Sequence, residues 1–555
     1  MEKPLIIQSD RTILAEVQNP AYPEVRGFLG SFSEMVKSPE YIHTYRITSI
    51  SLWNAAACGV SHEKIAAFLQ EWSKYPISRT LLKEIEEEYH AFGKVVLKRG
   101  ESGFYLDIED PDAYRRVLYY EPMADHISRV SDNRIYVNPT SRGDVKQVLM
   151  ELGLPARDVA GYEEGDPLDV EIDPEKLQLR PYQETAVDIF HAGGSAEGGS
   201  GVVVMPCGAG KTIVGIGIMA RVRAKTLVLT TNTTALKQWK RELVERTNLS
   251  EEQVGEYSGE NKNVQAVTVA TYQILTYRKS RNDDFKYFEI FDSRNWGLII
   301  YDEVHLLPAP VFRAVSSLQA KRRLGLTATL VREDGNEKDV FALIGPKKYD
   351  VPWKDLERQG FIAEAQCVEI RVPLAESISY DYSMANNRQA FRIASENPMK
   401  LPVVAYLLDK HENDNVLIIG QYLKQLREIS KQFNIPIITG ATPQKERDEI
   451  FAAFKRGETR QLAVSKVANF AVDLPDANVA IQISGTFGSR QEEAQRLGRV
   501  LRPKPGLNEA IFYTLVTDRS VEVKFARNRQ IFLSEQGYRY TIEHGDHYGL
   551  HRIDQ

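Results

Sequence analysis

Apolar residues recur along this chain in distinct rhythms, and each rhythm predicts a different arrangement of elements. From residue 50 to residue 99 they follow helical spacing in ISLWNAAACGVSHEKIAAFLQEWSKYPI and SRTLLKEIEEEYHAFGKVVLKR, which ends on a strand-like run. From residue 111 to residue 171, short strands such as RIYVN alternate with a helix at SRGDVKQVLMELGL. Beyond residue 177, short apolar runs alternate with helical segments, which is typical of a parallel sheet covered by helices.

The parallel-sheet rhythm occurs twice. VVVMP, TLVLT, VTVAT, LIIYDE and RLGLTAT form the first series of predicted strands, and NVLIIG, IPIITG, QLAVSK, VAIQIS and IFYTLV form the second. A less regular, helical interval follows Val351, and a chain of 555 residues is too long for one hydrophobic core. We therefore predict an α/β protein with small α/β accessory modules before two parallel-sheet cores, divided as an N-terminal accessory module (1–110), a small α/β module (111–171), a first core (172–355), a connector (356–405), a second core (406–535) and a tail (536–555).

The order helix, helix, strand in the first 110 residues favours a winged-helix-like module. A helical packing domain without a nucleic-acid role fits the same pattern equally well. The acidic run YEEGDPLDVEIDPE, which closes the second module, is typical of a solvated linker. The accessory modules therefore indicate a fold but no specific chemistry.

Composition limits the function only loosely. The net charge of −6 gives no overall attraction to nucleic acid, although a basic groove can coexist with an acidic exterior. Cys58, Cys207 and Cys367 form no CxxC pair, which argues against a disulfide framework or a cysteine-based zinc site. No run approaches the ~18 apolar residues of a membrane span, so we expect a soluble, cytoplasmic protein without a membrane partner.

The segment VVVMPCGAGKT has the features of a phosphate-binding loop, because an apolar strand enters a glycine-rich turn and a helical segment follows. Gly208 and Gly210 let backbone amides turn toward phosphate oxygens. Lys211 would reach the β- and γ-phosphates of ATP, and the Thr212 hydroxyl would bind Mg²⁺. Met205 occupies the position of the first glycine in the usual GxxxxGK pattern, a departure that is common in helicases.

Downstream, the strand in LIIYDEVHLL ends on two carboxylates, Asp302 and Glu303. They would lie at the carboxyl edge of the sheet, where ligands of open α/β folds bind. Asp302 suits an Mg²⁺ ligand, and Glu303 suits the base that orients the attacking water. Such a pair is usually only a solvated strand end, but the phosphate-binding loop upstream favours the catalytic reading.

The second core contains SRQEEAQRLGRVLRPK, in which Arg499 and Arg502 would share one helix face. A basic helix is normally a solvated or nucleic-acid-facing surface. The acidic residues before it and the partner core upstream favour arginine fingers, which stabilise the phosphoryl-transfer transition state. If the fingers and the phosphate-binding loop lie on different cores, hydrolysis requires the cores to close, as in a motor.

Taken together, PCGAGKT, DEVH, LTATLVRED, TGATPQKER and the long motif from SKVANFAVDLPD to QRLGRVLRPK closely resemble XPB-type helicases of superfamily 2. The resemblance extends from Leu177 to Arg529 and is looser before it, where it implies that residues 111–171 form a small DNA-interaction domain of the damage-recognition type. It implies two tandem RecA-like cores and an ATP-dependent DNA helicase of 3′ to 5′ polarity in DNA repair. The tripeptide Arg332-Glu333-Asp334 and the second-core motif distinguish this family from DEAD-box and RecQ-like enzymes.

The resemblance also assigns roles to individual residues. Gln183, 28 residues before Lys211, would recognise adenine, although an ordinary turn also explains its segment LRPYQ. Asp473 would lie near the ribose. Thr327, Thr329 and Arg496 would couple hydrolysis to movement. The remaining assignments are DNA contacts or strand separation, at Thr230, Gln238, Thr271, Arg332, Glu333, Asp334, Thr442 and Ser465.

The stretch from residue 377 to residue 400 falls where the family carries a thumb-like insertion that grips DNA. Its aromatic and arginine side chains suit single-strand binding, although a helical packing insert explains them nearly as well. The candidates there are Tyr380, Tyr382, Arg388, Phe391 and Arg392.

Three other functions share much of this sequence evidence. A duplex-DNA translocase that does not separate strands has the same motifs, and backbone contacts alone do not exclude RNA. A degenerate ATPase serving as a DNA-binding scaffold would have lost Lys211, Glu303 or a finger arginine, and none is lost. The expected partner is DNA, single-stranded and at a junction or in a duplex. No nuclease motif is evident, so strand cutting would need a partner nuclease.

Overall fold

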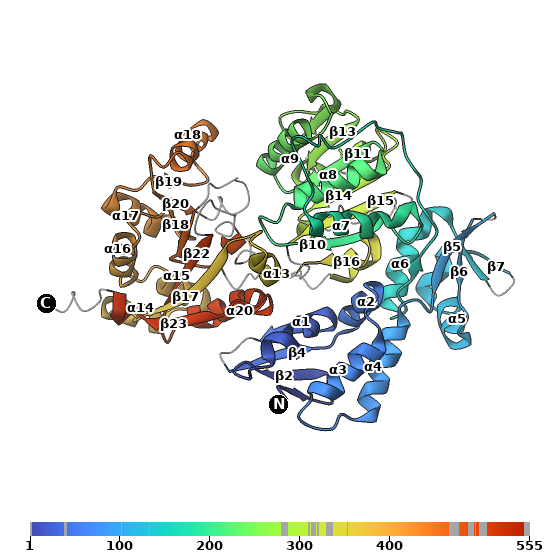
Figure 1. Ribbon diagram of the computed structural model, residues 1–555, viewed down its shortest axis with the longest axis horizontal. Helices are drawn as coiled ribbons and strands as arrows, with labels where there is room; N and C mark the ends of the chain where they lie inside the picture. The colour runs from blue at the N-terminus through green and yellow to red at the C-terminus, as the bar shows by residue number, and fades with distance from the viewer. Residues whose placement is uncertain are drawn as a thin grey trace. The chain divides into compact units, whose positions relative to one another are not determined.

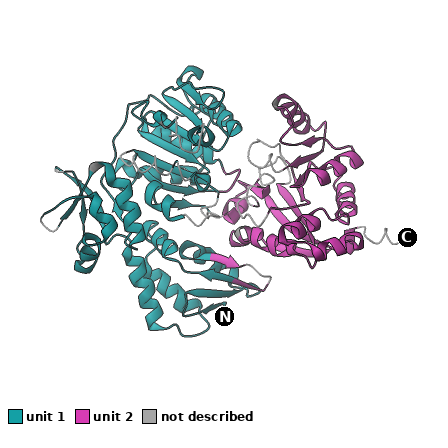
Figure 2. Ribbon diagram, turned by 180° about the vertical axis from the view of Figure 1, so that it is seen from behind, with its two compact units in different colours: residues 1–34, 44–205, 210–351 teal, residues 35–43, 206–209, 352–555 magenta. Residues whose placement is uncertain are grey.

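The computed structural model divides into two compact units (Figure 2). Unit 1 comprises Met1–Glu34, Thr44–Met205 and Gly210–Val351, and unit 2 comprises Met35–His43, Pro206–Ala209 and Pro352–Gln555. Within these, the residues that the structure describes are 3–37, 41–101, 103–131, 134–278, 287–308, 311, 318, 321–328, 337–351, 353–465, 477–486, 493, 496–498 and 508–548.

The N-terminal module combines a four-stranded sheet of order β1-β2-β4-β3 with four helices (Figure 1). Side-chain oxygens of Thr48, Ser61 and Ser78 accept hydrogen bonds from backbone amides at the starts of α2, α3 and α4, which fixes where these helices begin. The elements are β1 (Leu5–Ile7), β2 (Thr12–Glu16), α1 (Tyr22–Phe32), β3 (Glu34–Lys37), β4 (Ile42–Arg46), α2 (Ser49–Ala57), α3 (His62–Trp72) and α4 (Arg79–Ala91).

The second module is a five-stranded sheet of order β7-β8-β6-β5-β9. Because β5 and β6 form an antiparallel hairpin within this sheet, the module starts near residue 95 rather than at residue 111. The strand-like run KVVLKR is therefore β5 of this sheet and not the wing of the preceding helices. The elements are β5 (Val96–Gly100), β6 (Gly103–Asp107), α5 (Pro111–Leu118), β7 (Ile127–Ser131), β8 (Arg134–Val137), α6 (Arg142–Glu151) and β9 (Arg157–Asp158).

The first core is a seven-stranded sheet of order β12-β13-β11-β14-β15-β10-β16, with parallel pairing throughout. Its central strands are buried along their whole length, which explains why they read as continuous apolar runs. The elements are α7 (Pro181–His191), β10 (Ser200–Val204), α8 (Lys211–Val222), β11 (Thr226–Thr230), α9 (Thr233–Arg246), β12 (Val254–Tyr257), β13 (Val267–Thr271), α10 (Tyr272–Leu275), β14 (Leu298–Asp302), β15 (Arg322–Thr327), α12 (Glu337–Asp339), η7 (Val340–Ile344) and β16 (Lys347–Asp350).

The second core is also a parallel seven-stranded sheet, of order β19-β20-β18-β21-β22-β17-β23. Two expected boundaries differ here, because β17 from the predicted connector lies between β22 and β23, and β23 comes from the predicted tail. The elements are α13 (Trp353–Arg358), β17 (Glu364–Val372), α14 (Glu376–Met384), α15 (Asn387–Ser395), α16 (Lys400–Lys410), β18 (Val416–Gly420), α17 (Leu423–Phe433), β19 (Ile437–Ile438), α18 (Gln444–Lys455), β20 (Gln461–Ser465), β21 (Val479–Gln482), β22 (Glu509–Thr517), α20 (Val521–Glu535) and β23 (Tyr540–His544).

The predicted fold class is confirmed, since two parallel-sheet cores follow two small α/β modules. Among the helices described, none is both long and apolar enough to cross a membrane.

Candidate nucleotide site and nucleic-acid surface

The first core places its candidate catalytic residues at the carboxyl ends of three neighbouring parallel strands. Lys211 follows β10, Glu303 follows β14 and Thr327 ends β15, and these strands are adjacent in the order β14-β15-β10 (Figure 1). Because parallel strands all end at one edge, residues far apart in sequence converge there.

The turn between β10 and α8 requires its two glycines. Gly208 and Gly210 have φ angles of 82° and 83°, in the left-handed region that disfavours side chains. A Cβ atom on Gly210 would also lie 2.6 Å from Nε2 of Gln183. Met205 is fully buried, and its backbone N–H donates to the Thr327 carbonyl at 2.9 Å. The departure from the usual first glycine therefore places an apolar side chain in the core just before the turn.

Lys211, the first residue of α8, lies opposite Glu303. Its Nζ atom is 3.4 Å from Glu303 Oε1, and the two side chains are 11% and 18% exposed. Glu303 has a φ angle of 51°, which is costly for a residue other than glycine, on the order of 1–3 kcal/mol. Such backbone strain is concentrated at functional sites, where the surrounding fold enforces it.

Asp302 is held from two sides. Trp239 Nε1 of α9 donates to its Oδ2 at 2.9 Å, and the Tyr272 hydroxyl donates to its backbone carbonyl at 2.9 Å. Burial and the adjacent Glu303 charge raise the pKa of Asp302 to about 6. Burial also acts to raise the pKa of Glu303, but the charges of Lys211 and His305 outweigh it and hold that pKa below its ordinary value.

His305, the last residue of DEVH, connects Glu303 to β15. It is 4% exposed, and its Nδ1 lies 2.6 Å from Thr327 Oγ1 and 3.5 Å from Glu303 Oε2. His305, Trp239 and Tyr272 were not among the residues predicted for this site. The signal was present, because His305 belongs to DEVH, Trp239 directly follows Gln238 and Tyr272 directly follows Thr271.

Gln183 lies at the start of α7, where its Oε1 accepts a hydrogen bond from the Arg180 amide at 2.9 Å. The residue is 4% exposed, and its Nε2 faces Gly210 of the phosphate-binding turn. The structure therefore brings Gln183, Lys211, Asp302, Glu303 and Thr327 into one region, with Thr212 half-buried beside them on α8.

The candidate DNA contacts in the first core are less accessible than the sequence implied. Thr230 is fully buried, and its hydroxyl donates to the Ala270 carbonyl at 3.3 Å. Thr271 is 2% exposed, and its Oγ1 accepts from the Ile274 amide at 3.4 Å, which caps α10. Direct binding of a DNA phosphate would require both hydroxyls to give up these internal hydrogen bonds. Gln238 on α9 is half-exposed and is therefore more accessible.

In the second core, Ser465 ends β20 and is 3% exposed. Thr442 is half-buried, and its Oγ1 accepts from the Thr439 amide at 3.0 Å. Arg496 is fully buried and donates to Gln482 Oε1, while Gln482 Nε2 donates to Glu493 at 3.0 Å. The remaining predicted residues lie outside the described part of the chain: Thr329, Arg332, Glu333, Asp334, Asp473, Arg499 and Arg502.

The predicted DNA-binding insertion, residues 377–400, consists mainly of α14 and α15, and only some of its candidate side chains are exposed. Phe391 is fully buried, and its ring packs edge-on against Phe525 of α20 with centroids 4.9 Å apart. The Tyr382 hydroxyl accepts a hydrogen bond from the Val521 amide at 2.9 Å. These two side chains hold α14 and α15 to the second core, so the open stacking role expected of Phe391 is wrong. Tyr380 remains 74% exposed, and Arg388 and Arg392 are also exposed.

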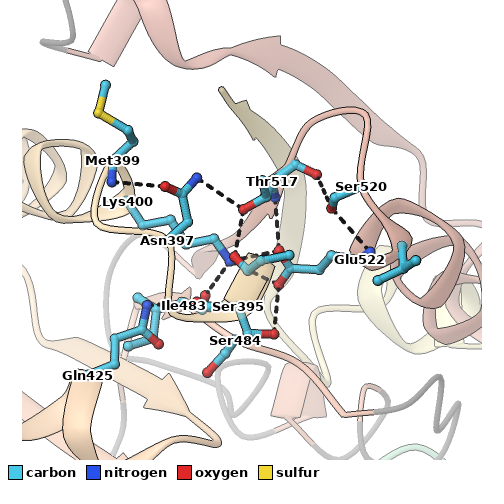
Figure 3. Close-up of polar contacts among 12 residues, drawn as sticks. Ser395, Asn397, Met399, Lys400, Gln425, Ile483, Ser484, Thr517, Ser520 and Glu522 are labelled. Carbon is cyan, nitrogen blue, oxygen red and sulfur yellow. Dashed lines mark hydrogen bonds and ion pairs between the residues drawn. The ribbon is translucent and has the colours of Figure 1, made fainter. Parts of the chain in front are cut away.

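A buried ion pair fixes the base of this insertion (Figure 3). Lys400 Nζ donates to both carboxylate oxygens of Glu522 at 2.9 Å and to the Ile483 carbonyl at 3.0 Å. Glu522 also accepts from the Thr517 amide at 2.9 Å, and Thr517 Oγ1 accepts from Asn397 Nδ2 at 3.2 Å. We refer to Asn397, Lys400, Thr517 and Glu522 as the anchor network. This network joins the start of α16 to the ends of β21 and β22 and to the start of α20. No sequence motif predicted it.

Known families match most of the chain. Residues 356–548 match the family described as ERCC3/RAD25/XPB C-terminal helicase. Residues 176–332 match the family described as type III restriction enzyme, res subunit. Residues 5–130 match the family described as helicase conserved C-terminal domain.

Several relatives align along nearly the whole length. The chain is 50% identical over 545 residues to the DNA 3'-5' helicase XPB of Mycobacterium tuberculosis, covering 98% of both chains. It is 49% identical to the DNA 3'-5' helicase XPB of Kineococcus radiotolerans, covering 98% of this chain and 97% of the relative. It is 32% identical to the general transcription and DNA repair factor IIH helicase/translocase subunit XPB of Enterocytozoon bieneusi, covering 97% of this chain and 92% of the relative.

Proposed function

The chain belongs to the XPB family of DNA helicases, and on that premise we propose that it hydrolyses ATP with Mg²⁺ in its first core to unwind DNA with 3′ to 5′ polarity. The observation that carries the proposal is the convergence of Lys211, Asp302 and Glu303 at one sheet edge. A role in DNA repair follows from the same family membership.

The site residues suit an ATP phosphate chain. The amides of the turn containing Gly208 and Gly210 would face phosphate oxygens, and the Lys211 ammonium would bind the β- and γ-phosphates. Glu303, whose pKa is held low by Lys211 and His305, would remain ionised and orient the attacking water. Gln183, whose Nε2 lies near Gly210, would contact the adenine end.

Mg²⁺ fits the adjacent carboxylates. Burial raises the pKa of Asp302 to about 6 beside a second acid, so a divalent cation would relieve the cost of holding both charges. Asp302 and the Thr212 hydroxyl would hold the ion, and oxygen ligands are those that Mg²⁺ prefers. The bound ion would neutralise charge that develops on the transferred phosphoryl group.

DNA would be held by both cores. We retain Gln238 as a contact because it is half-exposed, together with Tyr380 and Arg388 on the insertion. Arg332, Glu333 and Asp334 remain candidates for strand separation, and Arg499 and Arg502 for arginine fingers. Buried contacts such as Thr230, Thr271 and Ser465 would act by fixing the strand ends that present these surfaces.

The test is ATP hydrolysis with single-stranded DNA, duplex DNA and RNA, paired with unwinding of 3′-tailed and 5′-tailed duplexes. We expect stimulation by DNA over RNA and unwinding of the 3′-tailed duplex. Equal stimulation by RNA would contradict the proposed substrate, and unwinding from 5′ tails alone would contradict the polarity.

A duplex-DNA translocase is the second candidate, because the relative from Enterocytozoon bieneusi is named helicase/translocase. Displacement of a third strand from a triplex, without separation of a tailed duplex, would support this alternative. A partner nuclease and a cytoplasmic location remain predictions from the sequence.

A further inference from the structure

His62, at the start of α3, lies close to Glu86 and His90 in the C-terminal half of α4. Figure 1 shows α3 and α4 side by side in the N-terminal module. Each of His62, Glu86 and His90 offers a ligand atom, and these atoms all lie within 4.8 Å of one another. Among the residues that the structure describes, they form the one group of three histidine, cysteine or acidic side chains close enough to share a metal ion. All three are at least partly exposed, so an ion can reach them from solvent.

The helices position this group. Glu86 and His90 are four residues apart on α4 and therefore project from one face of that helix, opposite the buried Leu81 and Ile85. The spacing of a glutamate and a histidine by one helical turn is a common way to present two ligands to one ion.

The third ligand comes from another helix but is held in place. His62 is the first residue of α3, just after Ser61, whose side chain caps the helix. The Tyr89 hydroxyl on α4 donates to the Val60 carbonyl at 2.9 Å, which ties the start of α3 to α4. As a result the rings of His62 and His90 pack at a 67° angle with centroids 4.7 Å apart.

The two nitrogens of His62 face different carboxylates. Nε2 lies 3.6 Å from Glu86 Oε1, and Nδ1 lies 3.3 Å from Glu63 Oε1. This is the arrangement that metal-binding histidines commonly use, in which one nitrogen binds the ion and the other donates to a carboxylate. Histidine binds metals through a neutral imidazole nitrogen, which leaves the second ring nitrogen for such a carboxylate.

We propose that His62, Glu86 and His90 bind a divalent transition-metal ion, zinc by ligand type, with Glu63 orienting His62 from behind. Zinc–ligand bonds of about 2.0–2.1 Å place tetrahedral ligand atoms roughly 3.3 Å apart. The three side chains would approach that spacing by small rotations about their terminal bonds. The ion would cross-link α3 and α4 and leave one coordination position for water.

This site is chemically separate from the proposed nucleotide site. Mg²⁺ prefers oxygen ligands, whereas a set with two imidazoles favours zinc and similar ions. Millimolar Mg²⁺ should therefore not displace zinc from it. Its existence does not depend on the ATPase or helicase activity.

The experiment is titration of the chelator-treated full-length protein with zinc chloride in excess Mg²⁺, followed by calorimetry. Parallel samples would carry His62→Ala, His90→Ala, Glu86→Gln, Glu63→Gln or, as the matched control, the exposed His547→Ala. We expect one zinc ion per chain to bind the wild type and His547→Ala in a saturable step. The step should be lost in His62→Ala and His90→Ala, strongly weakened in Glu86→Gln and weakened about 10- to 100-fold in Glu63→Gln.

A second measurement guards against unfolding of the variants. Cobalt chloride should give the visible absorption of tetrahedral coordination with the wild type and not with His90→Ala, while the far-ultraviolet dichroism of both stays the same. Zinc should also raise the melting temperature of the wild type and of His547→Ala, and not that of His62→Ala or His90→Ala. The proposal is overturned if His62→Ala and His90→Ala, folded by dichroism, take up zinc with wild-type affinity.

Discussion

Lys211 Nζ and Glu303 Oε1 lie 3.4 Å apart at the edge of the first sheet. The ammonium expected to hold phosphate and the carboxylate expected to orient water therefore neutralise each other in a largely buried setting. Each group needs the other, because a lone charge in such a setting would be expensive. Phosphate oxygens would compete with Glu303 for the lysine, so phosphate binding and the release of the carboxylate for water are linked.

Replacing Lys211 by alanine should abolish ATP hydrolysis and leave DNA binding measurable, because the ammonium lies beside Glu303 and would contact phosphate rather than DNA. Lys83→Ala, on the exposed face of α4, serves as the control. ATPase assays and DNA mobility shifts would measure the two properties separately. Near-normal hydrolysis by the Lys211 variant would contradict the assignment of the phosphate-binding loop.

Replacing Glu303 by glutamine should preserve ATP binding and lower the rate of hydrolysis by about 10²- to 10⁴-fold, because the amide keeps the shape but not the basicity. The variant should accumulate in an ATP-bound, DNA-bound form. Single-turnover hydrolysis and nucleotide binding would be measured beside Glu289→Gln, an exposed acid of the same core. Normal turnover would place the base elsewhere.

Phe391 and Tyr380 should respond oppositely to alanine, although both were expected to stack on DNA. Phe391→Ala removes a fully buried ring packed on Phe525 and should cost about 3–5 kcal/mol in stability. Tyr380→Ala changes a side chain that is 74% exposed, so stability should stay the same while affinity for single-stranded DNA falls. Urea denaturation and DNA titration distinguish these outcomes. Unchanged DNA affinity in Tyr380→Ala would make α14 a packing element.

The anchor network predicts a destabilisation that a second substitution relieves. Lys400→Met leaves the fully buried Glu522 carboxylate without its ammonium partner and should cost about 3–5 kcal/mol. Adding Glu522→Gln removes that charge and keeps an acceptor for the Thr517 amide, so the double variant should regain stability. Urea denaturation of the single and double variants measures the difference. If the double variant is the less stable, the charge on Glu522 is not the source of the loss.

The sequence predicted the central strands well because strands buried on both faces read as unbroken apolar runs, such as TLVLT for β11. It missed β17 because EAQCVEIRV carries Glu369 and Arg371, which are buried and paired with each other. Burial of a charged pair depends on contacts from distant segments, including Gln530 of α20, and no local pattern reveals them.

The functional residues also fall into two groups, those that a sequence motif predicted correctly and those that it did not. Lys211 belongs to one motif, and Asp302 and Glu303 belong to another, and each motif directly follows a strand that defines its geometry. The prediction for Phe391 was wrong because it rested on the mixture of aromatic and arginine residues in this stretch and not on their spacing. Its spacing with Ala390 and Ala394 on α15 already formed an apolar stripe that predicts burial. The anchor network was beyond prediction, since Lys400 and Glu522 are 122 residues apart.

The hydrogen bond from the Met205 amide to the Thr327 carbonyl has a mechanical consequence. It continues the pairing of β10 with β15 by one residue beyond the end of β10, up to the turn that follows. We therefore expect these two strand ends to move together rather than to separate from each other.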